Sequence, residues 1–330
     1  MRTKNVRAIS ESLSVIGLGC WAIGGSLVWA DSDDARSAAT IRRAIELGVN
    51  LFDVAPVYGF GHAESVLGTV LRDTGQRKNV LVATKCGLVW DDTQRITRDL
   101  TPSSIAREID ASLQRLRTDY VDIYQLHWPD PNVPLQETLS ELQRLQQAGK
   151  IRYIGLTNYS RPQALEALEM APVASCQGLY NMLERNPESY HSIPLEYRTQ
   201  DEILPLCEQH GLAFFPYSPL FQGLLTGAFT RRTTFEPGDV RSQNPKLNGE
   251  QFQRRVAAAD ELKQLATECG HPLSHLALAW LVGNDAVTSV ICGAQTVDHI
   301  EQNAAAAAWD PGEEVLTRAE RILQRHAVID

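Results

Sequence analysis

Four side chains that can transfer or hold protons follow short apolar runs of the sequence. Asp53 and Tyr58 come at and after the run 50–53, Lys85 follows the run 81–84, and His127 follows the run 122–126. Taken singly, a strand-end Asp is usually a turn former, and a lone Tyr or His usually serves packing or structural hydrogen bonding. A lysine that ends an apolar strand is harder to explain, because a partly buried ammonium needs a partner or a function. The convergence of four such types therefore indicates chemistry.

These four types make a coherent set for adding a proton to an oxyanion as hydride reaches carbon. A tyrosine phenol has a pKa of about 10, which is too high for easy proton transfer at neutral pH. A lysine cation is expected to stabilise the phenolate and lower that pKa, and an aspartate can hold the lysine in place. A neutral histidine can orient a carbonyl oxygen by hydrogen bonding. The hydride itself requires a cofactor, because no side chain supplies one.

The elements that must position these side chains are short apolar runs that alternate with helical patterns. Three helical runs end directly at Gly48, Gly149 and Gly211, as expected for glycine caps at helix C-termini. The predicted strands are 13–17, 50–53, 81–84, 122–126, 153–155, 174–177, 213–216 and 289–291. The predicted helices are 33–47, 64–72, 103–116, 135–147, 162–168, 201–210, 252–283, 297–308 and 315–325.

Strands that alternate with helices predict parallel pairing through crossover connections. No Ser/Gly-rich linker divides residues 1–330, so we predict one domain of the α/β class, a closed (β/α)8 TIM barrel with extended loops at its C-terminal face. Two doubly wound halves fit less well. The polar stretch 230–251, punctuated by Pro and Gly, predicts a long functional loop near the active-site face.

Composition excludes several classes of function. The chain is 43% hydrophobic and 22% charged, which argues against disorder, and its net charge of −9 argues against a nucleic-acid partner. The apolar stretch 212–229 contains Pro216 and Pro219, so we expect no membrane span, and the N-terminus lacks a signal-peptide core. The six scattered cysteines form no Cys-x-x-Cys pair, so we expect no metal site and a cytoplasmic protein.

Seven motifs spread along the chain resemble those of aldo-keto reductases, and the resemblance extends over essentially its whole length. The resemblance is strongest to the bacterial branch that includes general-stress and glyceraldehyde-type reductases. It implies a catalytic tetrad of Asp53, Tyr58, Lys85 and His127, in which Tyr58 is the general acid of carbonyl reduction. The motifs are LFDVAPVYGFGHAESVLG (51–68), LVATKCG (81–87), VDIYQLHWPD (121–130), GKIRYIGLTNYS (149–160), SCQGLYNMLER (175–185), FPYSPLFQGLLTG (215–227) and ICGAQTVDHIEQN (291–303).

The resemblance also implies a nicotinamide dinucleotide that lies extended across the barrel mouth, and GLGC at 17–20 is not a Rossmann fingerprint. Asn158 and Gln177 match residues that bond the nicotinamide carboxamide. Tyr217 matches the aromatic residue that stacks on the nicotinamide ring, with core packing as the alternative, and 218–227 resembles the loop over the pyrophosphate. The implied contacts are Gly19, Cys20, Trp21, Asp53, Thr157, Asn158, Gln177, Tyr217, Ser218, Leu220, Gln222, Gly223, Gly293, Ala294, Gln295, Thr296, His299 and Asn303.

Two of these positions bear on the choice between NADP(H) and NAD(H). Many relatives carry Lys or Arg at the position of Gln295, and Arg or Gln at the position of His299. A cation at these positions pairs with the 2′-phosphate of NADP. Gln295 cannot form an ion pair, although Thr296 and the following helix still offer donors to an anion. The resemblance favours NADP(H), because members of this family commonly use it. Use of NAD(H), or of both cofactors, stays open.

The expected substrate is a small-molecule carbonyl compound or the matching alcohol. Trp21, Trp29, Trp90 and Trp128 are candidates for an aromatic-walled substrate pocket, although each singly could be core. Two alternatives remain: an NAD(P)+-dependent dehydrogenase of sugars or pyridoxal-type alcohols, and a redox-sensing binding protein with slow turnover that resembles channel β-subunits. A metal-dependent hydrolase ranks lower, because no metal triad occurs at the strand ends. The oligomeric state is left open.

Overall fold

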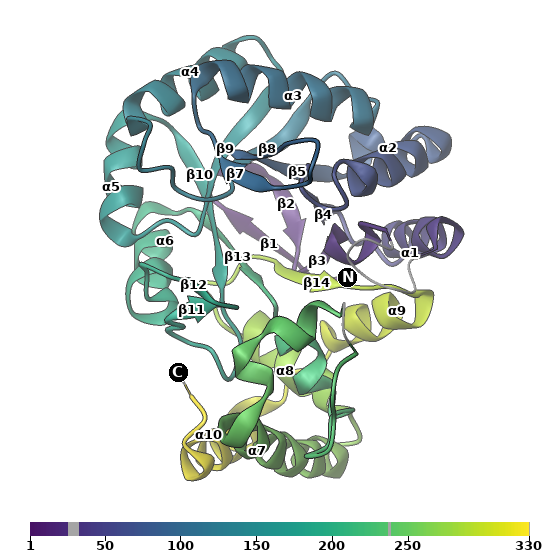
Figure 1. Cartoon of the computed structure of the whole chain (residues 1–330). Helices are drawn as coiled ribbons and strands as arrows, with labels where there is room; N and C mark the ends of the chain where they lie inside the picture. The colour runs from purple at the N-terminus through teal and green to yellow at the C-terminus, as the bar shows by residue number, and fades with distance from the viewer. Residues whose placement is uncertain (26–32, 237–238, 330) are drawn as a thin grey trace.

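In the computed structural model, which describes residues 1–25, 33–236 and 239–329, eight parallel strands form the (β/α)8 TIM barrel that the sequence predicts (Figure 1). Their order in the sheet is β13–β10–β9–β8–β5–β4–β3–β14. The ring closes where the Thr288 amide, just before β14, donates to the Phe214 carbonyl of β13 at 2.9 Å. The strands are β3 (Ile16–Gly19), β4 (Leu51–Asp53), β5 (Leu81–Cys86), β8 (Val121–Leu126), β9 (Ile151–Thr157), β10 (Val173–Leu179), β13 (Ala213–Tyr217) and β14 (Val290–Gly293).

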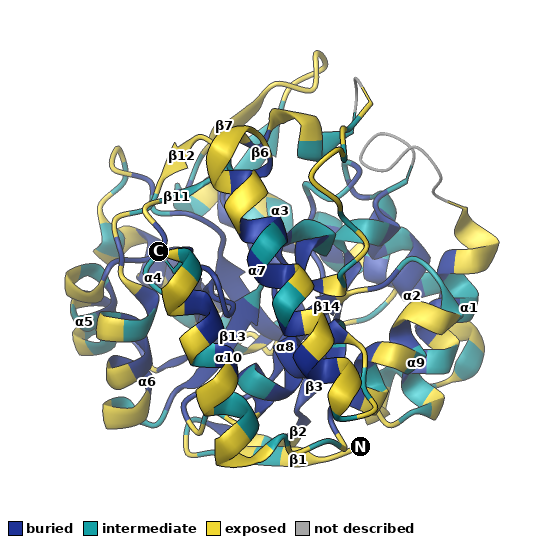
Figure 2. Cartoon of the chain, turned by 90° about the horizontal axis from the view of Figure 1, so that it is seen from below, coloured by how far each residue is buried: buried dark blue, intermediate teal, exposed yellow. Residues whose placement is uncertain are grey.

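Helices surround the barrel and turn their apolar sides toward it, while their exposed sides face outward (Figure 2). Two further helices, α7 (Gly249–Glu268) and α10 (Gly312–His326), pack against each other at one margin of the molecule (Figure 1). The helices of the ring are α1 (Asp34–Glu46), α2 (His62–Thr74), α3 (Pro102–Leu116), α4 (Leu135–Gln147), α5 (Arg161–Met170), α6 (Leu204–His210), α8 (Leu273–Val282) and α9 (Val297–Ala306).

Local sequence explains where several helices begin and end. The Thr101 hydroxyl accepts the Ser104 amide at the start of α3, and Pro102 takes the first position, where its missing N–H costs nothing. Gly149 and Gly211 follow α4 and α6 with φ of 75° and 67°. A residue with a Cβ is strained in this left-handed conformation, and glycine is not. The positive φ values directly after the two helices confirm the predicted glycine caps.

The floor of the barrel is an N-terminal hairpin that the sequence did not predict. Strands β1 (Thr3–Val6) and β2 (Ile9–Ser14) pair antiparallel, and Ile9 and Leu13 pack into a buried cluster with the inward residues of the barrel strands. The predicted strand 13–17 was therefore wrong in its bounds, since it joins the end of β2 to the start of β3. The break falls at Val15, between β2 and β3. The hydroxyl of the preceding Ser14 donates to the Ile16 carbonyl, and its amide donates to Asn50 Oδ1.

The predicted helix 252–283 is in fact two helices. It breaks between α7 and α8, where Gly270 has a φ of 78° and Pro272 precedes α8 and cannot donate a backbone hydrogen bond. The first turn of α7 occupies the last residues of the stretch 230–251. That stretch also contains two 3-10 turns, η5 (Val240–Gln243) and η6 (Pro245–Leu247).

Two further hairpins lie at the end of the barrel opposite β1 and β2 (Figure 2). They are β6 (Leu88–Trp90) with β7 (Ile96–Arg98), and β11 (Ser189–Tyr190) with β12 (Ile193–Pro194). Both follow the carboxyl ends of barrel strands, so they help to form the rim around the barrel mouth. Among the described residues, no helix has the length and apolar character needed to cross a bilayer.

Candidate active site

The structure brings the four predicted proton-handling residues together at the barrel mouth. Lys85 at the end of β5 donates from Nζ to Asp53 Oδ1 at 2.7 Å, to the Val54 carbonyl at 3.1 Å and to Tyr58 Oη at 3.2 Å. His127 follows β8, and its ring meets the Tyr58 ring edge-to-face with centroids 6.1 Å apart. Parallel strands that end at one rim explain this convergence.

Asp53 and Lys85 form a buried ion pair whose polar atoms have several partners. Lys85 is 0% exposed and Asp53 is 3% exposed. The second Asp53 oxygen, Oδ2, accepts the side-chain amides of Gln125 at 3.1 Å and Gln177 at 2.9 Å. A buried charge pair is tolerated when further hydrogen bonds complete it. The carboxylate therefore fixes the lysine that contacts Tyr58.

Burial moves the pKa values of the two aromatic groups in opposite directions. Desolvation raises the pKa of the Tyr58 phenol well above its usual value, and the negative charge of Asp53 acts in the same direction. The sequence-based expectation that Lys85 lowers this pKa was therefore wrong for the net shift, because desolvation of the phenolate dominates. Burial also lowers the pKa of His127 well below its usual value, and the Lys85 cation contributes. At neutral pH the site thus presents a phenol and a neutral imidazole.

These shifts predict the pH dependence of carbonyl reduction. A raised phenol pKa keeps the proton donor protonated at every pH below it, and a lowered histidine pKa keeps the imidazole neutral at every pH above it. We expect kcat/KM for reduction to be nearly flat from about pH 6 to 9, with losses only outside that range. Steady-state rates in buffers of constant ionic strength test this, and an inflection near pH 7 would contradict the assignment of these protonation states.

The implied nicotinamide contacts lie at the carboxyl ends of β9, β10 and β13. Asn158 Oδ1 accepts the hydroxyls of Tyr197 and Tyr217, both at 2.9 Å, and Asn158 Nδ2 donates to the His127 carbonyl at 3.2 Å. Gln177 is tied to Asp53. The adjoining Thr157 is buried and donates to Gln125 at 3.3 Å. The amides are therefore held in fixed orientations beside the proton-handling residues.

The remaining implied cofactor contacts lie on three segments that follow the carboxyl ends of β3, β13 and β14. Gly19 ends β3, and the short helix η1 (Cys20–Ile23) follows it. The Cys20 thiol is fully buried against the Leu18 carbonyl, so only its backbone can face a ligand. Trp21 is half-buried. Ser218, Leu220, Gln222 and Gly223 follow β13, while Gly293, Ala294, Gln295, Thr296, His299 and Asn303 span the end of β14 and α9.

The end of β14 has the space and the donors that an extended dinucleotide needs. A Cβ built on Gly293 would meet no atom within 4 Å, and the Gly293 carbonyl is held by Asn303 Nδ2 at 3.2 Å. Thr296 caps α9 by accepting the His299 amide at 3.2 Å. The positive end of the helix dipole therefore lies beside open space, which suits an anionic group. These residues fit a dinucleotide cofactor.

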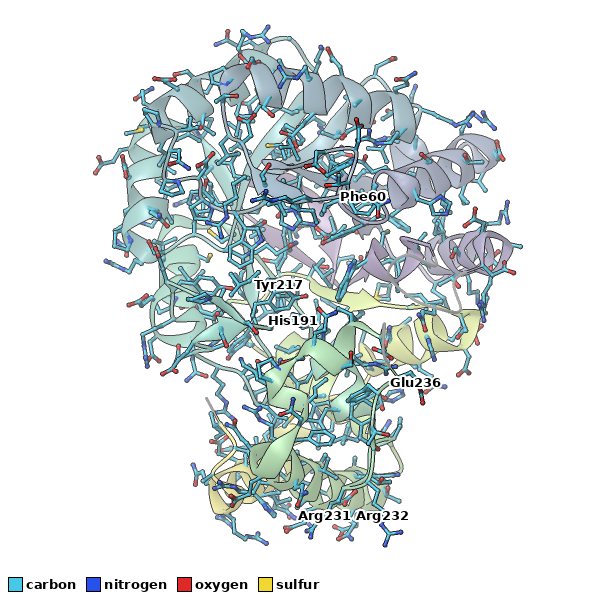
Figure 3. All side chains as sticks on the ribbon, in the orientation of Figure 1. Phe60, His191, Tyr217, Arg231, Arg232 and Glu236 are labelled. Atoms are coloured by element: carbon cyan, nitrogen blue, oxygen red, sulfur yellow. The ribbon has the colours of Figure 1, made fainter. Side chains whose placement is uncertain are left out.

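Three of the four tryptophans predicted to line a substrate pocket, Trp21, Trp90 and Trp128, lie within the described residues. Trp90 on β6 is half-buried and meets Phe60 edge-to-face, with centroids 5.4 Å apart. Trp128 is buried beneath the Arg98 guanidinium, which lies 5.3 Å from its ring. Trp29 lies outside the described residues. Figure 3 shows Phe60 at the barrel mouth and Arg231 and Arg232 far from it, near α7.

Several polar residues of the site were missed by the sequence analysis. Gln125 is buried inside β8 and bonds both Asp53 and Thr157, and the signal for it was a polar residue within an apolar strand. Tyr197 reaches Asn158 from beyond β12, which no local pattern indicates. Tyr190, on β11, packs edge-to-face on Tyr217 with centroids 5.3 Å apart. No group of three His, Cys, Asp or Glu side chains in the described parts of the chain is arranged to hold a metal ion.

Comparison with known proteins gives matches along nearly the whole chain. Residues 15–323 match the model of the aldo/keto reductase family. The chain is 37% identical to aldo-keto reductase YhdN of Bacillus subtilis, over 90% of this chain and 86% of the relative. It is 35% identical to the NADH-specific methylglyoxal reductase of Escherichia coli, over 89% of this chain and 90% of that relative. The structure of glycerol dehydrogenase AKR11B4 from Gluconobacter oxydans matches with a TM-score of 0.88 and 36% identity. The match covers 99% of this chain and 97% of that structure.

Proposed function

Because the chain belongs to the aldo/keto reductase family, we propose that it reduces small aldehydes or ketones to alcohols with a nicotinamide dinucleotide, and that Tyr58 supplies the proton. The observation that carries this proposal is the contact of Tyr58 Oη with the buried Lys85–Asp53 pair at 3.2 Å. The raised pKa of Tyr58 supports the reductive direction, because it keeps the phenol protonated. The activity would belong to the oxidoreductases that act on CH–OH groups with NAD(P).

Each residue of the tetrad has a defined part in this proposal. The nicotinamide supplies hydride to the carbonyl carbon when it is bound. Neutral His127 donates a hydrogen bond that orients the carbonyl oxygen, and Tyr58 donates its phenolic proton to that oxygen as negative charge develops. Lys85 stabilises the phenolate that remains, and Asp53 holds Lys85 in place. Asn158, Gln177 and Tyr217 would hold the nicotinamide against this group.

Oxidation of an alcohol by the same residues is the second candidate. The structural relative from Gluconobacter oxydans is a glycerol dehydrogenase, which favours this direction. In that direction Tyr58 must first lose its proton, so its raised pKa makes the oxidative rate rise by about tenfold per pH unit below that pKa. The two directions therefore differ in their pH profiles, although they share one site.

Purified protein tests the proposal directly when NADPH and NADH oxidation are followed in parallel against a panel of small aldehydes and ketones. Turnover of at least one carbonyl substrate, abolished in the Tyr58→Phe variant, is the expected result. Tight dinucleotide binding without turnover of any carbonyl would contradict reduction, and turnover of polyols at high pH would then support the oxidative alternative. Failure to bind either dinucleotide would overturn both.

Position 295 is proposed to set the preference between the two dinucleotides. Gln295 is half-buried beside the capped end of α9. Its backbone N–H donates to His299 Nδ1 at 3.5 Å. Common use of NADP(H) in the family favours that cofactor. The absence of a cationic side chain at position 295 and the NADH-specific Escherichia coli relative support NAD(H) as well. We therefore propose that the enzyme accepts both.

The Gln295→Arg variant is expected to bind NADPH about tenfold or more tightly than the native chain, with little change for NADH. An arginine there forms charge-assisted hydrogen bonds with a 2′-phosphate, which NADH lacks. Dissociation constants from fluorescence titration measure the ratio. Gln264→Arg, on an exposed part of α7, makes the same charge change away from the barrel mouth. An equal effect on both dinucleotides would place residue 295 away from the 2′-phosphate.

A further inference from the structure

The loop that follows β13 has an unusual backbone. Three residues with a Cβ have positive φ within five positions: Ser218 at 54°, Phe221 at 47° and Gln222 at 52°. Gly223 follows at 102°. Such conformations are costly outside glycine and persist only where surrounding contacts enforce them, often around bound ligands. The contacts that hold residues 218–223 therefore decide whether this loop keeps its shape.

Hydrogen bonds from two other segments hold this loop. Asn181, just after β10, donates from Nδ2 to the Ser218 carbonyl at 3.1 Å. Asn244, just before η6, donates from Nδ2 to Gln222 Oε1 at 2.8 Å. Gln222 Nε2 in turn lies 3.0 Å from Nε2 of His191, a residue with a lowered pKa that accepts as neutral imidazole. The loop is thus fixed at both of its strained ends.

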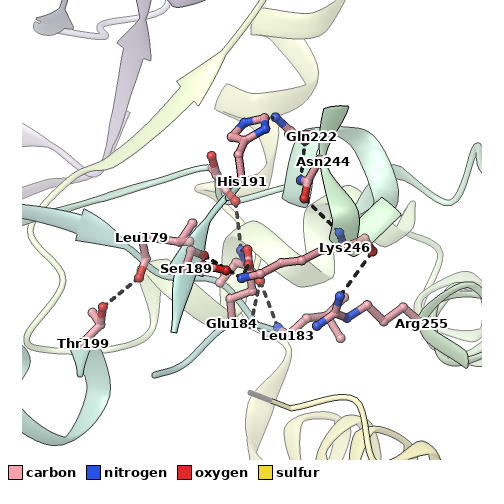
Figure 4. A network of polar contacts seen from close by, with 12 residues as sticks. Leu179, Leu183, Glu184, Ser189, His191, Thr199, Gln222, Asn244, Lys246 and Arg255 are labelled. Carbon is pink, nitrogen blue, oxygen red and sulfur yellow. Dashed lines mark hydrogen bonds and ion pairs between the residues drawn. The ribbon is translucent and has the colours of Figure 1, made fainter. Parts of the chain in front are cut away.

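One ion pair joins the two supporting segments (Figure 4). Lys246 Nζ donates to Glu184 Oε1 at 2.6 Å and to the Ser189 carbonyl of β11 at 2.7 Å. The other Glu184 oxygen accepts Asn181 Nδ2 at 2.9 Å. The ion pair therefore fixes the positions of both asparagines. Asn181 is hydrogen-bonded to Glu184, and Asn244 lies two residues before Lys246 in the chain.

The pair lies in a protected position beneath the loop. The Glu184 side chain is 2% exposed and that of Lys246 is 12% exposed. Burial raises the pKa of Glu184, while Lys246 and Asn181 oppose that shift. Arg255 on α7 is fully buried, donates to the Lys246 carbonyl at 3.3 Å, and places its guanidinium 5.1 Å from the Phe221 ring. Phe221 is itself one of the three strained residues, so the loop is also supported from below.

We propose that Glu184 and Lys246 are positioning residues that hold the 218–223 loop in the shape that receives the cofactor pyrophosphate. This inference rests on the proposed use of a nicotinamide dinucleotide. Neither residue is placed against the reacting atoms, so the pair acts on dinucleotide affinity through Ser218 and Gln222. The hydride and proton transfers at Tyr58 are expected to proceed normally once the cofactor is saturating.

The test measures binding of NADH and of ADP-ribose, which has the pyrophosphate without the nicotinamide, to Lys246→Met and Glu184→Gln variants. We expect both dissociation constants to rise about 10- to 100-fold, the penalty when the competent loop shape falls to a tenth or a hundredth of the population. KM for the cofactor should rise by a similar factor while kcat at saturation is kept. Lys246→Arg, which retains the charge, should recover much of the affinity.

Arg185→Met is the matched control. Arg185 also pairs with a glutamate, Glu320, at 2.6 Å, and its side chain is 13% exposed. Within the described part of the chain, no hydrogen bond or ion pair joins Arg185 to residues 218–223. Affinities unchanged in the Glu184 and Lys246 variants, or lowered equally in Arg185→Met, would overturn the positioning role. If Lys246→Met does not fold, Glu184→Gln gives the same readout with a nearly isosteric neutral side chain. Native protein that binds neither NADH nor ADP-ribose would instead refute the proposed function.

Discussion

Replacing Tyr58 by phenylalanine is expected to reduce carbonyl turnover by about 100- to 10,000-fold, the usual contribution of a general acid. The phenylalanine ring preserves the edge-to-face contact with His127 and the position beneath the Lys85 ammonium, which lies 4.9 Å from the ring centroid. What is lost is the hydroxyl that lies 3.2 Å from Lys85 Nζ. Steady-state kinetics with NADPH and NADH measure the loss, and titration of each dinucleotide should give affinities close to native.

Tyr153→Phe provides a control for the same chemical change at the other end of the barrel. The Tyr153 hydroxyl bonds Ser10 and Glu11 of β2, in the N-terminal hairpin, so it is remote from the barrel mouth. We expect that variant to keep full turnover. A Tyr58→Phe variant that retains turnover, or that loses dinucleotide affinity to the same extent as turnover, would show that Tyr58 has a structural role only.

The second large effect is expected for Lys85→Met, which should lose turnover and also about 3–5 kcal/mol of the free energy of unfolding. The loss of stability follows because Asp53 stays buried with a negative charge that its amide partners, Gln125 and Gln177, cannot neutralise. Turnover falls because no cation then stabilises the Tyr58 phenolate. Urea denaturation followed by circular dichroism gives the stability, and saturating steady-state assays at a temperature where the variant is folded give kcat.

A double variant separates these two consequences. Asp53→Asn combined with Lys85→Met removes both charges, so it should recover much of the lost stability but none of the turnover. Lys150→Met, which breaks the exposed ion pair with Asp110, should cost no more than about 1 kcal/mol. A Lys85→Met variant as stable as Lys150→Met would mean that the buried pair has solvent access that the structure does not show.

The sequence was informative wherever a short stretch carried its own signal. Strand-end placement of Asp53, Lys85 and His127 was predictable because buried parallel strands read as continuous apolar runs that stop where polar residues begin. Helix α4 matches its predicted range, 135–147, and Gly149 ended it as expected. By contrast, the break at Val15 was missed because apolar residues lie on both sides of it, and the division of 252–283 was missed although Gly270 and Pro272 mark it.

What the sequence by itself determined is the order of elements, the barrel and the residues that end its strands, because hydrophobic period and glycine caps are local properties. The tertiary structure alone decided how those residues act together. Closure of the barrel aligns Asp53, Tyr58, Lys85 and His127 and buries them, and the resulting desolvation raises the pKa of Tyr58 against the expected effect of its lysine neighbour. It also joins Glu184 to Lys246 across 62 positions of the chain. Distances and solvation of this kind depend on the packing of remote segments, which no local pattern encodes.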